Sequence, residues 1–123
     1  MLQNVDYDHD HIALGLIQTR LKALGLDLPY SFMRRPNTGV DSGHDLDNNG
    51  ALGEPRDMQG YGRFAGQGGM AVLSRLPIDL DASRDLSDVL WRDQQDPNLP
   101  QTPSGGFFSD VALTALRLHS VAA

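Results

Sequence analysis

The feature that most constrains the fold is a long stretch, residues 37–69, in which no hydrophobic period survives. Neither the spacing of an amphipathic helix nor the alternation of a strand runs through it. Most of the chain's 13 glycines fall in this stretch. Loops of this length are uncommon in compact domains and usually serve a function or remain disordered. The regular elements must therefore come from the flanking residues, and the loop is the candidate functional element.

The residues before the loop predict one helix and one strand. Apolar side chains recur there at spacings of three and four, which is the pattern of an amphipathic helix. These side chains are Leu14, Ile17, Leu21 and Leu24. Asp8 or Asp10 can cap the start of the helix, and Gly25 sits where a C-cap glycine is expected. After Pro29, the stretch "YSFM" is short and aromatic enough for a strand.

The residues after the loop predict a second strand. In "GGMAVLSRLPI" a continuous apolar run over 70–73, bounded by glycines and Pro77, indicates a buried strand. "DLSDVLW" fits a strand or a helical turn, and Ser109 can cap a short helical turn before the alternating "LRLHS". We therefore expect a single α/β domain over 1–123. Its predicted core is Leu14, Ile17, Leu21, Met70, Val72 and Leu73, with Trp91 at the edge.

Charge and composition exclude several classes of protein. With 16 acidic and 10 basic side chains the net charge is -6, which gives no support to the binding of nucleic-acid phosphates. The chain has no cysteine, so disulfides, thiol catalysis and zinc-cysteine sites are excluded. No apolar run is long enough to span a bilayer, and polar residues soon follow Met1. We therefore expect no membrane span and no signal peptide in this chain. The sequence does not determine the cellular compartment. Export would require a leader on a longer protein.

The stretch "GHDLDNNGALGEPRD", residues 43–57, has the opening of a calcium loop. Three oxygen-bearing side chains stand two apart and a glycine follows them: Asp45, Asp47, Asn49 and Gly50. With a backbone carbonyl near Ala51 and with Asp57 closing the site, these oxygens can hold a calcium ion. An EF-hand carries a bidentate glutamate at its twelfth position, whereas this loop carries Arg56. The same residues also fit a polar turn, in which Asp and Asn side chains bond nearby backbone N–H groups.

Other patterns have both a functional and a plainer interpretation. The "DHDH" run, residues 8–11, contains metal-ligand types but is explained more simply by carboxylates at a helix start. The glycines of "AGQGGM" can present N–H groups to a phosphate or admit a tight entry into the next strand. His119 and Ser120 are strand neighbours that point to opposite faces, so they do not act together. Four arginines are candidate phosphate contacts if folding brings them together: Arg34, Arg35, Arg63 and Arg75.

Four segments of the chain occur in a characteristic order: "NVDYDHDHIALGLIQTRL", "RRPNTGVDSGHDLDNNG", "PRDMQGYGRFAGQGGMAVLSRLPI" and "LWRD". In this order they resemble a bacterial branch of the endonuclease/exonuclease/phosphatase superfamily, most specifically over 37–78. The resemblance implies the N-terminal and central part of an α/β sandwich: strand, helix, strand, long loop, strand. It also implies a divalent cation, usually Mg²⁺, that orients a phosphate and helps to generate a nucleophilic water. The implied partner is a phosphorylated small molecule or a nucleic acid.

Two departures from the family pattern bear on activity. Asn4 stands at the position of a metal-binding glutamate, and an amide carries no charge to hold the cation. The family's later segments, which carry its catalytic histidines, do not follow Ala123. We therefore expect a fragment or a degenerate relative of a metal-dependent phosphoester hydrolase, inactive alone and able to self-associate. The alternative is a non-catalytic calcium-binding or interaction module that uses residues 37–69.

Overall fold

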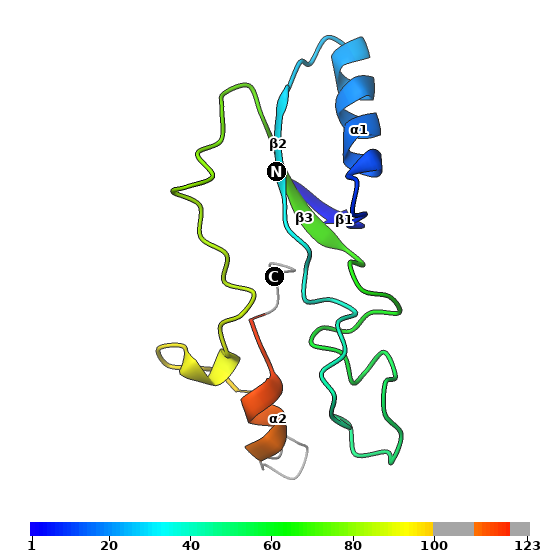
Figure 1. Ribbon diagram of the computed structural model, residues 1–123, viewed down its shortest axis with the longest axis vertical. Coiled ribbons are helices and arrows are strands. Elements are labelled where there is room, and N and C mark those ends of the chain that lie inside the picture. The colour runs from blue at the N-terminus through cyan, green and yellow to red at the C-terminus, as the bar shows by residue number, and fades with distance from the viewer. Residues whose placement is uncertain (100–109, 119–123) are drawn as a thin grey trace.

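The structure is a computed structural model that describes residues 1–99 and 110–118. Its elements are β1 (Leu2–Val5), α1 (Ile12–Ala23), β2 (Tyr30–Met33), β3 (Gly69–Ser74), the 3-10 helix η1 (Trp91–Asp93) and α2 (Asp110–Ala115). The molecule is a small α/β domain whose three strands form one antiparallel sheet in the order β1-β3-β2. α1 lies beside this sheet, and α2 lies at the other end of the molecule (Figure 1). The predicted α/β class and the order strand, helix, strand, long loop, strand are confirmed.

The sheet has two unlike faces because side chains alternate along each strand. The register places Ala71 of β3 opposite both Leu2 and Met33. Leu14 of α1 packs here, and Leu14, Met33 and Ala71 form the buried core cluster. Partly buried apolar side chains surround this cluster: Leu2, Val5, Tyr7 and Leu73. One helix thus covers one face of the sheet.

The prediction that residues 70–73 form a buried strand is wrong for the side chains on the face that α1 does not cover. Val72 is 37% exposed and Met70 is half-buried, whereas Ala71 is 1% exposed. The run is apolar throughout, but only alternate residues face α1, so burial follows the pleat of an antiparallel sheet with one covered face. Val72 is therefore not a core residue. The remaining predicted core and edge side chains are half-buried: Ile17, Leu21, Leu73 and Trp91.

α1 begins where Asp8 turns its carboxylate onto the first free backbone N–H groups. Oδ1 accepts a hydrogen bond from the N–H of Ile12 at 2.6 Å, and Oδ2 accepts one from the N–H of Ala13 at 3.1 Å. These bonds, the one from Ile12 foremost, hold the pKa of Asp8 below its usual value. His11 occupies the N-cap position, and of the two predicted candidates Asp8 supplies the capping hydrogen bonds from three residues upstream.

α1 ends at Ala23, and the turn that follows has the left-handed glycine that the sequence predicts. Gly25 has a φ of +89° and donates its N–H to the carbonyl of Lys22 at 3.0 Å. Leu24 lies beyond the helix and is 69% exposed, so the predicted apolar stripe ends one position early, at Leu21. In the described part of the chain, no helix is long and apolar enough to cross a membrane.

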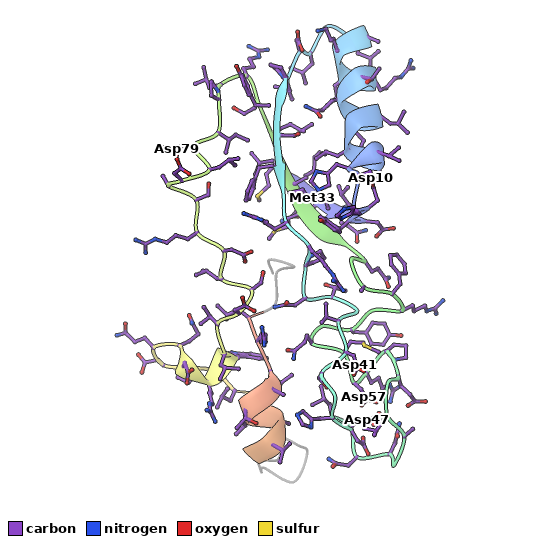
Figure 2. All side chains as sticks on the ribbon, in the orientation of Figure 1. Asp10, Met33, Asp41, Asp47, Asp57 and Asp79 are labelled. Atoms are coloured by element: carbon purple, nitrogen blue, oxygen red, sulfur yellow. The ribbon has the colours of Figure 1, made fainter. Side chains whose placement is uncertain are left out.

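The loop between β2 and β3 folds back on itself as two arms. Isolated bridges pair Thr38 with Gly60 and Asp41 with Met58, which joins the outgoing arm to the returning one. No helix or strand element occurs between Met33 and Gly69, as the lack of a period predicts. The turn between the arms carries the acidic residues of 43–57, at the end of the molecule far from α1 (Figure 2).

The residues after β3 return to the start of the loop. The buried side-chain amide of Asn37 donates to the carbonyls of Ser87 and Leu118, at 2.8 Å each. Within residues 85–91, a turn lies at Ser87 and Asp88, and Leu90 forms an isolated antiparallel bridge with Arg117. Neither the predicted strand nor the predicted helical turn spans the segment, and η1 begins only at Trp91. Three residues singled out in the sequence lie outside the described residues: Ser109, His119 and Ser120.

Candidate cation site in the acidic loop

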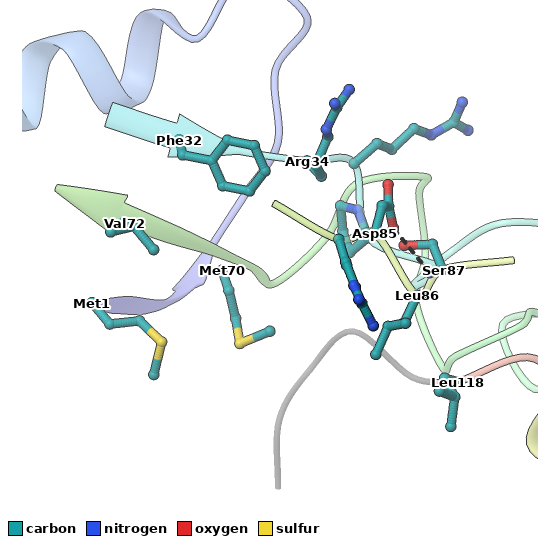
Figure 3. Close-up of a pocket in the computed structure, with 12 residues that line it drawn as sticks. Met1, Phe32, Arg34, Met70, Val72, Asp85, Leu86, Ser87 and Leu118 are labelled. Carbon is teal, nitrogen blue, oxygen red and sulfur yellow. Dashed lines mark hydrogen bonds between the residues drawn. The ribbon is translucent and has the colours of Figure 1, made fainter. Parts of the chain in front are cut away.

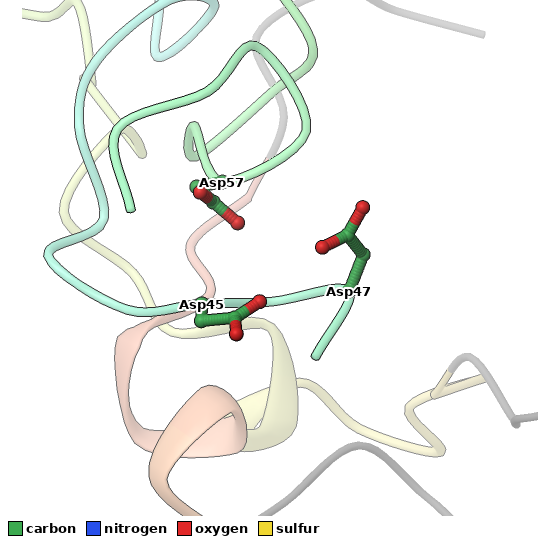
Figure 4. Close-up of side chains that lie close together, drawn as sticks. All are labelled: Asp45, Asp47 and Asp57. Carbon is green, nitrogen blue, oxygen red and sulfur yellow. The ribbon is translucent and has the colours of Figure 1, made fainter. Parts of the chain in front are cut away.

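Three carboxylates converge at the turn between the two arms of the loop. Ligand oxygens of Asp45, Asp47 and Asp57 all lie within 4.8 Å of one another, and the side chains face a common space (Figure 4). Asp45 and Asp47 stand two apart on the outgoing arm, and their carboxylates reach the same space. Asp57 comes from the returning arm, next to the bridge between Asp41 and Met58. The structure thus brings together three of the four residues that the sequence predicts as ligands.

Asp57 is the buried member of the cluster and anchors the turn through backbone hydrogen bonds. It is 0% exposed, and a buried carboxylate is costly unless it is hydrogen-bonded. Its Oδ1 accepts a hydrogen bond from the N–H of Leu46 at 2.9 Å, and its Oδ2 accepts one from the N–H of Glu54 at 3.2 Å. One side chain therefore fixes two points of the turn.

Asp45 and Asp47 shape the outer part of the same turn. Asp45 accepts hydrogen bonds from the N–H of Gly50 at 2.8 Å and from that of Asn49 at 3.2 Å. The bond from Gly50, with a smaller contribution from Asn49, holds the pKa of Asp45 below its usual value. Asp47 accepts a hydrogen bond from the N–H of Asn49 at 3.3 Å and lies 3.6 Å from the guanidinium of Arg56. The predicted polar turn is therefore present.

Asn49, the fourth predicted ligand, is engaged in the turn's own hydrogen bonds. Its Oδ1 accepts from the N–H of Ala51 at 2.7 Å. Its Nδ2 donates to the carboxylates of Glu54 at 2.7 Å and Asp47 at 3.3 Å. Glu54 is the residue that the sequence reasoning missed. The available signal was a further carboxylate in the same glycine-rich loop, close to Arg56, which replaces the last EF-hand ligand.

The chemistry of the cluster suits a hard cation. All three groups are carboxylates, which Ca²⁺ and Mg²⁺ prefer, whereas structural zinc sites use cysteine sulfur and histidine nitrogen. An ionised carboxylate has about four acceptor positions, so the hydrogen bonds to backbone N–H groups leave room for a metal ligand bond. Within the described residues, Arg56 makes the only ion pair with the cluster, and its side chain is 72% exposed. One exposed guanidinium does not balance three carboxylates.

The other candidate residues lie apart from this cluster. Asn4 sits at an irregularity of β1, where the pairing register shifts between Gln3 and Val5, and its φ is +58°. The N–H of Gly68 donates to the carboxylate of Asp6 at 2.9 Å, so the protein itself uses this donor of the predicted phosphate nest. In the described residues, the run 8–11 contributes to no metal-compatible group. The four predicted arginines do not form one set: Arg34 and Arg35 line a groove (Figure 3), and Arg63 and Arg75 do not.

Comparison with known proteins adds no relative: no protein-family model, no curated protein and no solved structure matches this chain.

Proposed function

We propose that this protein binds a hard divalent cation, calcium or magnesium, through Asp45, Asp47 and Asp57 in a partial domain of the endonuclease/exonuclease/phosphatase type. The observation that carries the proposal is the convergence of three carboxylates within 4.8 Å around one turn. Like charges at this separation repel, and a divalent cation replaces that repulsion by attraction. The hydrogen bonds to Asp45 and Asp57 hold these oxygens in place before the ion arrives, which lowers the ordering cost of binding.

Asp57 is already satisfied by two backbone hydrogen bonds, so the feature that favours an ion over the turn alone is the closeness of the three carboxylates. Two backbone N–H groups orient the carboxylate of Asp57, and its residue has no exposed surface through which water could screen the charge. Oxygens of Asp45 and Asp47 lie within 4.8 Å of an oxygen of Asp57, close enough for one cation to contact all three groups. The loop lacks the bidentate ligand of an EF-hand, so we expect weak binding, on the order of 10⁻⁴ to 10⁻³ M.

The first prediction is that calcium raises the stability of the folded chain. Because the ion binds only the folded turn, free Ca²⁺ at about 100 times the dissociation constant raises the free energy of unfolding by about 2.7 kcal/mol. Asp47→Asn keeps the shape and an acceptor oxygen but removes one charge, so it is expected to lose most of this gain. Thermal melts with calcium, with magnesium and with a chelator measure the effect.

The matched control is Asp79→Asn, outside the acidic loop. Asp79 also accepts hydrogen bonds from backbone N–H groups in a turn, those of Asp81 and Ala82 at 3.1 and 3.0 Å. This variant is expected to keep the full response to calcium. The response should also fade as the pH falls through the pKa of Asp45, which its hydrogen bond from Gly50 holds below the usual value, because a protonated carboxyl does not bind the ion. If the midpoint of thermal unfolding of the wild type is the same with calcium, magnesium and chelator, the three carboxylates stabilise the turn and bind no cation.

A specific observation also favours descent from a phosphoester hydrolase. α1 covers one face of the sheet, while on the other face Val72 is exposed and Met70 is half-buried, as in one half of a layered sandwich. The proposed parent reaction is magnesium-dependent cleavage of a phosphoester in a phosphorylated small molecule or a nucleic acid. Asn4 occupies the position of the family's metal-binding glutamate, and its amide supplies no charge.

The second prediction is that the chain alone hydrolyses little or no phosphoester, even with saturating magnesium. The assay follows release of nitrophenolate from bis(p-nitrophenyl) phosphate and from p-nitrophenyl phosphate, with magnesium and with a chelator. We expect both substrates to react at the rate of protein-free controls. Chelator-sensitive turnover in purified protein would contradict the prediction and would make catalysis the leading function.

A further inference from the structure

Asn49 and Gly50 lie next to each other in the turn of the acidic loop. Of the chain's five asparagines, only Asn49 precedes a glycine. Both residues are exposed, and neither belongs to a helix or a strand. Gly50 has no side chain to shield its backbone nitrogen, and a Cβ there would meet nothing within 4 Å. This nitrogen can therefore approach the side-chain amide carbon of Asn49, Cγ, without steric hindrance.

A hydrogen bond holds the side chain of Asn49 against its own backbone. Its Oδ1 accepts from the N–H of Ala51 at 2.7 Å. The ring that this bond closes contains both Cγ of Asn49 and the nitrogen of Gly50, so the two atoms are kept in one tight turn. When a nucleophile attacks Cγ, negative charge develops on Oδ1, and a fixed N–H donor at this oxygen stabilises that charge.

The carboxylate of Asp45 acts on the nitrogen of Gly50. Its Oδ2 accepts a hydrogen bond from the N–H of Gly50 at 2.8 Å. A charged acceptor draws this proton toward itself and raises the electron density on the nitrogen. An amide nitrogen attacks only as its proton leaves, so a base within hydrogen-bond reach assists the step. Asp45 thus faces the nucleophile, while the N–H of Ala51 faces the oxygen of the group that is attacked.

We propose that Asn49 is a site of spontaneous deamidation, in which the backbone nitrogen of Gly50 is the nucleophile. This nitrogen forms a bond to Cγ of Asn49 and gives up its proton by way of Asp45. The bond between Cγ and Nδ2 breaks, and Nδ2 takes up a proton and leaves as ammonia, which gives a cyclic succinimide. Water then opens the ring at one carbonyl or the other and leaves aspartate or isoaspartate at position 49. One water is consumed and one ammonia is released, and nothing is oxidised or reduced.

The reaction replaces a hydrogen-bond donor of the turn by a negative charge. In the structure Nδ2 of Asn49 donates to the carboxylates of Glu54 at 2.7 Å and Asp47 at 3.3 Å. An ionised carboxylate only accepts, so two attractive contacts become repulsion between like charges. The turn is then less stable without a counter-ion. The new carboxylate also adds a ligand to the three of the cluster, a consequence that rests on the proposed cation binding.

The reaction is measured on the purified wild-type chain, kept folded at mildly alkaline pH and sampled over days. Mass spectrometry of its peptides follows the conversion of each amide to an acid. Asn48 is the internal control, because it is exposed in the same turn but precedes Asn49 rather than a glycine. We expect position 49 to lose most of its amide while position 48 keeps its own. A parallel sample in urea should lose the amide of Asn49 no faster, because unfolding removes the contacts with Asp45 and Ala51.

Gly50→Ala tests the role of the glycine nitrogen. A Cβ at position 50 has room, and the variant is strained only by its φ of +85°, so it should keep the wild-type circular dichroism spectrum. The added side chain hinders the approach of the nitrogen to Cγ of Asn49. Loss of the amide at position 49 should therefore nearly cease in this variant.

Asn49→Asp tests the effect of the product on the turn. With a chelator present, its midpoint of thermal unfolding should lie below that of the wild type, because the contacts of Nδ2 are lost. It should also lie below the midpoint of Asn48→Asp, which adds the same charge at the neighbouring position. Calcium should raise the midpoint of Asn49→Asp by more than it raises that of the wild type.

The opposite outcomes overturn the inference at separate points. Equal loss of amide at positions 48 and 49, or loss at position 49 only after unfolding, contradicts the deamidation site. Rapid loss in Gly50→Ala contradicts the role of the glycine nitrogen. An Asn49→Asp midpoint equal to that of the wild type in chelator contradicts the effect on the turn. If calcium stabilises neither protein while position 49 still loses its amide, the proposed cation binding fails and the deamidation site is upheld.

Discussion

Gly39→Ala is expected to unfold the domain or to leave it only marginally stable. Gly39 has a φ of +72°, and a Cβ there would overlap the carbonyl oxygen of Phe64 and lie 2.9 Å from the nitrogen of Ala65. Both neighbours are backbone, so no side chain can move aside. Gly39 also donates its N–H to the carbonyl of Gly60 at 2.9 Å, where the two arms of the loop meet. We expect a loss above about 4 kcal/mol in the free energy of unfolding.

Gly43→Ala is the control for Gly39→Ala. It measures the cost of the left-handed conformation without the steric overlap of a Cβ with backbone atoms. Gly43 has a φ of +75°, and a Cβ there would meet nothing within 4 Å. Its expected cost is about 1–2 kcal/mol, which is the penalty of the left-handed region alone. Urea unfolding followed by circular dichroism compares the two variants with the wild type. Equal losses would show that the arms do not cross closely at Gly39.

Leu14→Ala is the second change with a large expected effect. Leu14 is 1% exposed and is the only fully buried side chain that α1 contributes to the core. With Met33 and Ala71 it makes up the buried core cluster, so few neighbours can close the cavity that the truncation leaves. We expect a loss of about 2–5 kcal/mol, a large part of the total stability of a small domain.

Leu16→Ala is the matched control for Leu14→Ala. Both are leucines within α1, but Leu16 is 66% exposed. Helix propensity changes equally in the two variants, whereas burial changes only at Leu14. The free energy of unfolding should therefore change by less than about 0.5 kcal/mol in Leu16→Ala. Comparable losses from urea denaturation would mean that α1 does not pack on the sheet through Leu14.

The sequence predicts α1, β2 and β3 because their signals are local, whereas the strand before α1 is expected only from the family resemblance. Spacings of three and four locate α1, and "YSFM" coincides with β2, Tyr30–Met33. The exposure of Val72 could not be predicted in the same way. A continuous apolar run does not reveal whether one face of a strand or both will be covered, since that depends on elements distant in sequence. The prediction that Leu24 belongs to the apolar stripe was wrong for a related reason, because α1 ends at Ala23, before the apolar spacing does.

The candidate site was predictable to a similar extent. The alternation of Asp45 and Asp47 and the return of the chain at Asp57 are readable from residue types and spacing, and the structure brings these three together. The orientation of Asn49 is not readable, because its oxygen can satisfy a backbone N–H or a ligand at similar energy. In the structure it satisfies Ala51. Binding of an ion, descent from a hydrolase and the hydrolase's phosphorylated partner stay predictions.

The side-chain amide of Asn37 couples the local unfolding of two segments that are distant in sequence. One NH₂ group serves the carbonyls of Ser87 and Leu118, which lie 50 and 81 residues further along the chain. Asn37 is 8% exposed, so detachment of either segment breaks a hydrogen bond of this amide in a nearly dry setting. Detachment of one segment is therefore penalised unless the surroundings of Asn37 also admit water. The segment around Ser87 and residues 116–118 should consequently exchange their protected amide hydrogens as one cooperative unit.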